Sequence, residues 1–202
     1  MKLRSRVLFL VGLVFFAGCG SFTPPLQTGQ EIPAGKVLVI GKFMIDPPWY
    51  LKGSKPEPGE KQENMQNIMV AMTRDLSKKV KENTMYRADM NLDVTLYESF
   101  YYAIPPGTMY IRNTQVMKPT GWTNAMGATM FDVLKFYRNL KLDIPANAKA
   151  VYIGTILYKH DGKRMLSVTV QDEYGQMLKD LPRMNIPGLK SGDVVKRLAV
   201  IK

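Results

Sequence analysis

Residues 92–104 constrain the fold more than any other stretch, because their apolar and polar side chains alternate. One side of the stretch is apolar and is interrupted only by Glu98; it carries Leu92, Val94, Leu96, Phe100, Tyr102 and Ile104. The other side carries Asp93, Thr95, Tyr97, Ser99, Tyr101 and Ala103. Successive side chains of a strand point to opposite faces of a sheet. The pattern therefore predicts one long strand with a buried face and a solvated face, as is typical of antiparallel sheets.

Further strands are expected at the apolar runs 36–45, 138–144, 150–159, 164–171 and 194–201. The first of these is apolar on both faces in its first half, which indicates a central strand. Asp161-Gly162 is the dipeptide of a type I′ turn and predicts a tight hairpin between the runs on either side of it. Residues 130–137 fit a short helix or a strand, and residues 118–128 read as a loop. We therefore expect a mainly β fold, a single antiparallel β-sandwich, with α+β as the alternative.

Two helices are expected beside the strands. Residues 62–83 place apolar side chains at helical spacing, namely Met65, Ile68, Met69, Met72, Leu76 and Val80. This amphipathic helix would pack on the sheet. A short helix at 172–180 is indicated by Asp172 at the N-cap and Glu173 in the first turn.

A turn is predicted at Pro105-Pro106-Gly107, because proline fixes φ and glycine accepts a positive φ. With the strands before and after it, this turn is similar to a hairpin of transthyretin-like and carboxypeptidase-regulatory-like domains. That resemblance implies a β-sandwich fold and implies nothing about function.

One sequence pattern occurs twice. Residues 31–43 and 143–156 share an acidic residue, Ile-Pro-Ala, a lysine, an apolar run and an Ile-Gly pair. Ile104-Pro105 and Ile186-Pro187 repeat the opening more loosely. Gly41 and Gly154 fall inside the predicted strands, where a bulge or a close backbone approach is expected. Two equivalent strands in the two halves of a sandwich would account for the pattern.

The N-terminus has the organisation of a secretory signal. Lys2, Arg4 and Arg6 precede an apolar run at 7–16, which is too short for a membrane span. Phe16-Ala17-Gly18-Cys19 then resembles the lipobox of bacterial lipoproteins, in which leucine usually stands at the position of Phe16. The resemblance implies that Cys19 becomes the acylated N-terminus and anchors the protein to a membrane.

The residue after the cysteine bears on the destination. Gly20 is not the aspartate that keeps enterobacterial lipoproteins at the inner membrane. The resemblance therefore implies the outer membrane, facing the periplasm or the cell surface. We expect a cleaved signal at 1–18, an acylated tether at 19–33 and one domain at 34–202.

Composition restricts the chemistry. The chain has one cysteine and one histidine, so disulfides, cysteine-based zinc sites and histidine-rich metal sites are not expected, and no cofactor is implied. We interpret His160 as a solvated turn residue. The net charge of +11 falls to about +8 once the three cations of the signal are removed. The cations are scattered and form no basic block, so nucleic acid is not an expected partner.

These observations favour a non-catalytic envelope protein that binds a protein or polymer partner or supports an assembly. Its candidate contact surface consists of aromatic residues, namely Trp49, Tyr50, Tyr97, Tyr101 and Trp122. One alternative is an envelope hydrolase that uses Asp132, Asp172 or Glu173. Another is a binder of anionic lipid or polysaccharide, whose affinity would fall steeply with salt.

Overall fold

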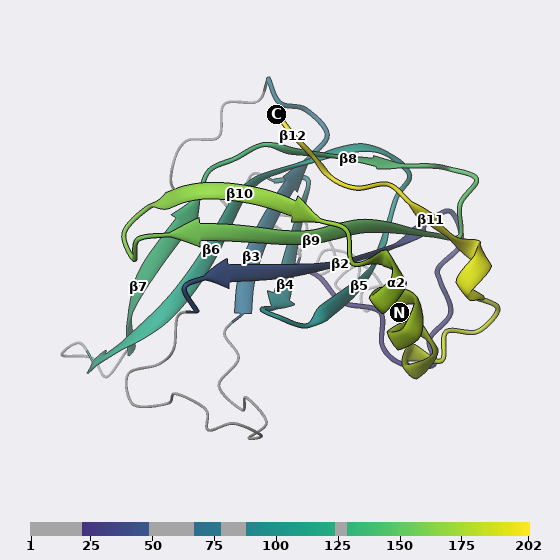
Figure 1. Cartoon of the computed structure of the whole chain (residues 1–202), viewed down its shortest axis with the longest axis horizontal. Helices are drawn as coiled ribbons and strands as arrows, with labels where there is room; N and C mark the ends of the chain where they lie inside the picture. The colour runs from purple at the N-terminus through teal and green to yellow at the C-terminus, as the bar shows by residue number, and fades with distance from the viewer. Residues whose placement is uncertain (1–21, 49–66, 78–87, 124–128) are drawn as a thin grey trace, which may run out of the picture.

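The computed structural model describes residues 22–48, 67–77, 88–123 and 129–202, with the backbone alone for 118–123 and 129–131. In these ranges the chain forms two β-sheets packed face to face, with one short α-helix outside them (Figure 1). The predicted mainly β class is confirmed.

The first sheet has the strand order β1-β4-β3-β6-β8-β12, and β7 also pairs with β6. Its strands are β1 (Phe22–Thr23), β3 (Asn67–Thr73), β4 (Met90–Thr95), β6 (Gly107–Thr123), β7 (Thr129–Phe136), β8 (Leu140–Ile144) and β12 (Val200–Ile201). β6 is the longest strand and pairs with β8 along its first part and with β7 along its second.

The second sheet has the order β10-β9-β2-β5, with β11 also pairing with β9. Its strands are β2 (Val37–Asp46), β5 (Ser99–Ile104), β9 (Ala150–His160), β10 (Met165–Gln171) and β11 (Val194–Lys196). β2 and β9 run parallel to each other, and β1 runs parallel to β4. Both sheets are therefore mixed, whereas the sequence predicted an antiparallel sandwich.

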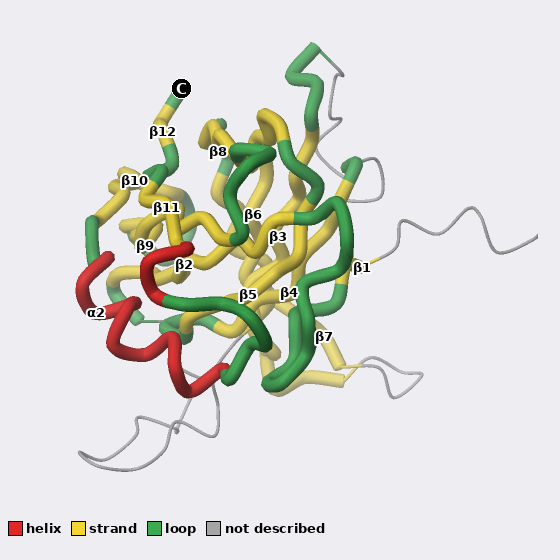
Figure 2. Tube along the Cα trace, turned by 90° about the vertical axis from the view of Figure 1, so that its right-hand side faces the viewer, coloured by secondary structure: helices red, strands yellow, loops and turns green. Residues whose placement is uncertain are grey.

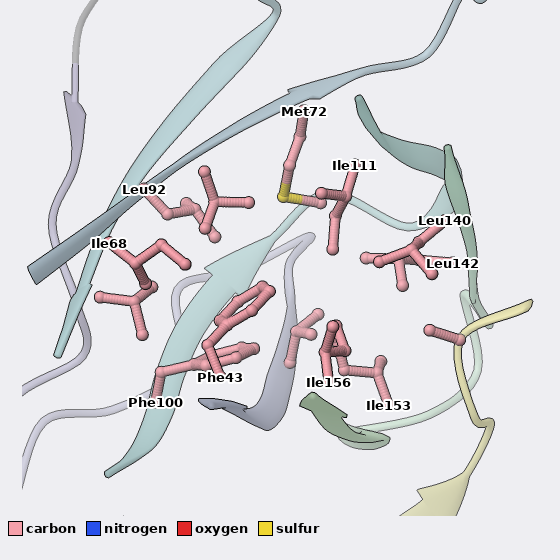
Figure 3. Close-up of a cluster of buried hydrophobic side chains, with 14 of the residues drawn as sticks. Phe43, Ile68, Met72, Leu92, Phe100, Ile111, Leu140, Leu142, Ile153 and Ile156 are labelled. Carbon is pink, nitrogen blue, oxygen red and sulfur yellow. The ribbon is translucent and has the colours of Figure 1, made fainter. Parts of the chain in front are cut away.

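The main core lies between the two sheets and draws side chains from both (Figure 3). Aromatic rings fill much of it: Phe43 stacks on Phe100 with ring centroids 5.4 Å apart, and Phe136 stacks on Tyr158 at 4.5 Å. Such pairs add to the free energy of burying the rings.

A second core covers the outer face of the second sheet. The helix α2 (Tyr174–Asp180) and the 3-10 turn Leu181–Met184 place Met177 and Leu181 over Leu38, Ile40 and Tyr152. Figure 2 shows α2 on the side of this sheet that faces away from the first sheet. β2 is therefore buried on both faces, and the prediction of a central strand there is confirmed.

The helix predicted at 62–83 is wrong over 67–73, which form strand β3. Ile68, Val70 and Met72 point into the core at every second position. Ile68 and Met72 fit the helical period equally well, because a spacing of four satisfies both periods. Pairing with β4 and β6 decides in favour of the strand; residues 62–66 and 78–83 lie outside the described residues.

The single strand predicted at 92–104 is also wrong. β4 ends at Thr95 and β5 begins at Ser99 in the other sheet, and Tyr97 between them has a φ of 66°. The alternation continues across the break because both sheets point their apolar faces into the same core. Pro105-Pro106-Gly107 likewise joins the two sheets, so it is a turn but not the predicted hairpin.

Three other predictions need correction. The predicted loop at 118–128 is wrong at its start, because β6 continues to Thr123. The ambiguous stretch at 130–137 is strand β7. The final strand predicted at 194–201 is divided between the sheets, since β11 pairs with β9 and β12 pairs with β8.

The hairpin predicted at Asp161-Gly162 is confirmed, but its type I′ turn is not. β9 and β10 form the expected hairpin, which is closed by a hydrogen bond from Asp161 N–H to the Arg164 carbonyl at 3.2 Å. Gly162 has a φ of 89°, but Asp161 lacks the positive φ that a type I′ turn also requires. The short helix predicted at 172–180 is α2.

Candidate functional site

The four Ile-Pro turns gather at one end of the sandwich. Strand register places Val37 beside Ile104, Leu38 beside Ala150 and Gly107 beside Ile144. The fourth turn, at Ile186-Pro187, lies at the same end, because Lys149 Nζ donates a hydrogen bond to the Gly188 carbonyl at 3.0 Å. The repeated pattern therefore marks chain corners at one end. The strands that follow the two full copies, β2 and β9, are neighbours in one sheet, so the prediction of two sandwich halves is wrong.

The glycines of the repeated pattern allow these strands to pack closely. The register between β2 and β9 shifts at Gly41, which is the predicted bulge. A Cβ on Gly41 would lie 2.7 Å from Phe100 Cζ. Gly154 has a φ of 99°, and a Cβ there would lie 2.6 Å from Val170 Cγ1. The predicted close approach is confirmed at both positions.

Three of the corners line an open depression with a volume of about 440 Å³, which we call the corner pocket. Its lining combines aliphatic side chains, turn backbone and charges of both signs: Glu31, Ile32, Pro33, Ala34, Gly35, Lys36, Ala148, Lys149, Pro187 and Gly188. Two corners are closed by hydrogen bonds from Lys36 N–H to the Pro33 carbonyl at 3.1 Å and from Ala148 N–H to the Pro145 carbonyl at 3.3 Å. The pocket is thus built from turns whose backbone is fixed in part by proline.

The adjacent carboxylates Asp172 and Glu173 hold α2 against the second sheet. Glu173 Oε2 accepts hydrogen bonds from Lys42 Nζ and from Thr155 Oγ1, each at 2.7 Å. Asp172 Oδ2 pairs with Lys196 Nζ at 2.7 Å, and its Oδ1 accepts the backbone N–H of Tyr174, the first residue of α2, at 3.1 Å. The predicted N-cap is wrong by one residue, because Glu173 is the N-cap of α2 and Asp172 precedes it.

Electrostatics agree with a structural role for this pair. The hydrogen bond from Lys42 lowers the pKa of Glu173, and the hydrogen bond from Lys196 lowers the pKa of Asp172. A general acid needs a raised pKa to hold its proton at neutral pH. Asp132, the third candidate of the hydrolase hypothesis, is exposed on β7 in the other sheet.

His160 is buried, so its interpretation as a solvated turn residue is wrong. Its Nδ1 accepts the backbone N–H of Gly162 at 3.0 Å, which leaves Nε2 to donate to the Pro47 carbonyl at 2.8 Å. The ring lies 6.2 Å from that of Phe136. Both nitrogens therefore serve to fix the end of the β9–β10 hairpin.

Of the two described tyrosines predicted on a contact surface, Tyr101 is buried and Tyr97 is half-buried. Tyr101 is 8% exposed beneath the α2 layer, and burial raises the pKa of its hydroxyl. Tyr97 is half-buried, and its hydroxyl donates to the Ile45 carbonyl at 2.9 Å. The structure does not bring these two side chains together on an exposed face. Cys19, Trp49 and Tyr50 lie outside the described residues, as does the side chain of Trp122, whose backbone belongs to β6.

Sequence reasoning also missed two buried asparagines on the outer side of the first sheet. Asn91 and Asn113 flank Ala71 in the strand register and are 3% and 1% exposed. Within the described part of the chain, Asn91 Oδ1 and both amide atoms of Asn113 have no hydrogen-bond partner. No sequence signal identifies them, because asparagine at an outward strand position predicts solvation.

Among the residues that the structure describes, no group of three or more His, Cys, Asp or Glu side chains is placed to hold a metal ion. The helices in the same ranges include none with the length and apolar character needed to cross a bilayer. Comparison with protein-family models, with curated proteins and with solved structures finds no match.

Proposed function

We propose that this chain is a lipid-anchored protein of the bacterial cell envelope, whose β-sandwich binds an envelope protein or polymer at the outer membrane. The observation that carries the proposal is the N-terminal sequence, in which three cations, a short apolar run and Phe16-Ala17-Gly18-Cys19 occur in the order of a lipoprotein signal. Acylation of Cys19 would hold the domain at the membrane surface, because two or more acyl chains bind a bilayer durably.

The described side chains support a binding role over a catalytic one. The histidine and both neighbouring carboxylates are engaged in contacts that fix the hairpin and α2. The corner pocket, by contrast, is open and lined by turns whose backbone conformation is set by proline. We propose the corner pocket as the contact for the partner, in place of the buried tyrosines.

The anchor is tested by fractionating an enterobacterial host that expresses the full chain. Wild-type protein is expected in the outer membrane with incorporated labelled fatty acid, and Cys19→Ser is expected to lose both. Gly20→Asp should move the protein to the inner membrane, whereas the matched change Gly20→Ser should leave it in place. A Cys19→Ser protein that still fractionates with membrane would overturn the lipoprotein reading.

The binding role is tested separately by crosslinking the anchored protein in its own host. Ala34 is exposed and lines the pocket, so Ala34→Arg is expected to abolish recovery of the crosslinked partner. Asn67→Arg makes the same change of charge at an exposed position outside the pocket lining and should leave recovery unchanged. Equal recovery with the two variants would refute the assignment of the pocket, while leaving the test of the anchor intact.

A further inference from the structure

Strand β10 lies at the edge of the second sheet, and β12 of the first sheet lies close to part of it. It is the terminal strand in the sheet order, and among the described strands it pairs with β9 alone (Figure 1). Its seven residues, Met165–Gln171, include no charge and no proline. Natural edge strands usually carry a charge or a proline that discourages pairing, because the unpaired backbone groups of an edge can hydrogen-bond to another strand. The one irregularity is a register shift near Leu166, and pairing with β9 is regular from Ser167 to Gln171.

The charges around β10 are arranged for pairing with itself. Lys163 and Arg164 precede the strand, and Asp172 and Glu173 follow it. In an antiparallel pair centred on Val168, the basic end of each copy lies beside the acidic end of the other, which brings Arg164 near Asp172. The Arg164 side chain is 80% exposed and makes an exposed ion pair with Asp161. The Asp172 side chain is 40% exposed and pairs with Lys196. Both are therefore accessible, and exposed pairs of this kind contribute little to the stability of the monomer.

The apolar side chains follow the same symmetry. Val168 and Val170 pack against the core between the sheets. Leu166 is 59% exposed. In the register centred on Val168, Leu166, which stands at the register shift, comes next to Val170 of the second copy, so pairing would cover part of its exposed surface. Ser167 and Thr169 would face each other on the polar side, and the two five-stranded sheets would join into one.

From these observations we propose that β10 pairs antiparallel with β10 of a second copy of this chain and forms a two-fold dimer. The second copy is favoured over a strand of another protein because the opposite charges at the two ends of β10 match only when the strand meets its own reverse. This inference is independent of the lipid anchor and of the corner pocket.

Disulfide trapping tests the register in the membrane with the full chain. The sequence has no cysteine other than Cys19. Val168→Cys would place two thiols on the two-fold axis, within reach of a disulfide. Mild oxidation is expected to give a covalent dimer, whereas Thr108→Cys on β6, in the other sheet, should give none. Absence of the dimer, or trapping of a different protein by Val168→Cys, would overturn the proposal.

Exchanging the charges at the two ends of β10 tests the same pairing through the molecular mass of the protein in solution. The detergent-solubilised wild-type protein is expected to have the mass of a dimer. Arg164→Glu and Asp172→Arg should each raise the dissociation constant at least about tenfold, since each puts like charges opposite one another. The double variant restores opposite charges and should restore the dimer. A defect of folding in Asp172→Arg would not be rescued in this way.

A charge reversal away from β10 serves as the matched control. Lys141→Glu reverses a half-buried charge in the first sheet, where Lys141 pairs with Asp143, and should leave the mass unchanged. A wild-type protein that remains monomeric at high concentration would overturn the proposal. So would a double variant as weak as the single ones, because the dimer would then be built on another surface.

Discussion

Replacement of Gly154 by alanine tests the packing of β9 against its neighbours. Gly154 has a φ of 99°, a conformation that L-residues rarely adopt. We expect backbone strain of about 1–3 kcal/mol from this conformation alone. The new Cβ would also lie 2.6 Å from Val170 Cγ1, 3.2 Å from the Gln171 carbonyl oxygen and 3.3 Å from Leu198 Cδ2. Such overpacking costs about 1–3 kcal/mol, so the free energy of unfolding should fall by about 2–6 kcal/mol.

Two other glycines separate the two contributions. Gly162 has a φ of 89° with nothing within 4 Å of an added Cβ, so Gly162→Ala should show the strain alone. Gly41 has no such φ, but its Cβ would lie 2.7 Å from Phe100 Cζ and 2.9 Å from Ile153 Cγ1, so Gly41→Ala should show the crowding alone. The Gly154→Ala loss should be close to the sum of the other two.

Urea denaturation of the three purified variants and the wild type measures these differences, with the slope of the transition checked for constancy. If Gly154→Ala destabilised the protein no more than Gly162→Ala, the crowding of β9 by β10 and by Leu198 would be refuted.

Three further predictions concern buried and ionised groups. The Tyr158 hydroxyl lies 3.1 Å from Thr114 Oγ1, and both residues are fully buried. Tyr158→Phe and Thr114→Val should each destabilise the protein by about 1–2 kcal/mol in denaturant titrations. The double variant should lose less than the sum of the two single losses, and strict additivity would argue against the hydrogen bond. Asn113→Leu replaces unpaired buried amide atoms with an apolar group and should raise the melting temperature; a drop would contradict this reasoning. Lys42 lowers the pKa of Glu173 in the folded state, so the stability that this carboxylate contributes is present above its unfolded pKa of about 4.3 and is lost as pH falls through the folded pKa. The free energy of unfolding, measured from pH 6 to 3, should therefore fall less for Glu173→Gln than for the wild type. Parallel curves for the two proteins would exclude this linkage.

The sequence predicts the strand content well where turn chemistry accompanies the apolar pattern. Asp161-Gly162 marks the β9–β10 hairpin, although not as a type I′ turn, and Asp172 lies one residue before the N-cap of α2. Alternation alone does not show which sheet a strand joins. The break at Tyr97 is invisible in residues 92–104, because the chain leaves one sheet and enters the other with its apolar side still facing the same core.

The helix predicted at 62–83 fails for a related reason. Ile68 and Met72 satisfy helical and strand periods alike, and only pairing with β4 and β6 selects the strand. Pairing between distant segments leaves no local mark in the sequence.

The candidate site was predicted less well than the fold. Tyr101 alternates with apolar residues as a solvated side chain would, but the α2 layer covers that face. The burial of His160 was also not predicted, because the carbonyl that accepts its hydrogen bond belongs to Pro47, which is remote in sequence. The repeated Ile-Pro pattern marks the corners that line the corner pocket. It does not show that β2 and β9 are neighbours, which is what brings the corners together.

The claim that the protein is anchored by lipid is tested most directly at its mature N-terminus. Mass spectrometry of the N-terminal peptide from membrane-extracted protein should find Cys19 as the first residue, with the added mass of a diacylglyceryl group and its fatty acids. A peptide that retains Met1, or one that contains Cys19 unmodified, would contradict the account.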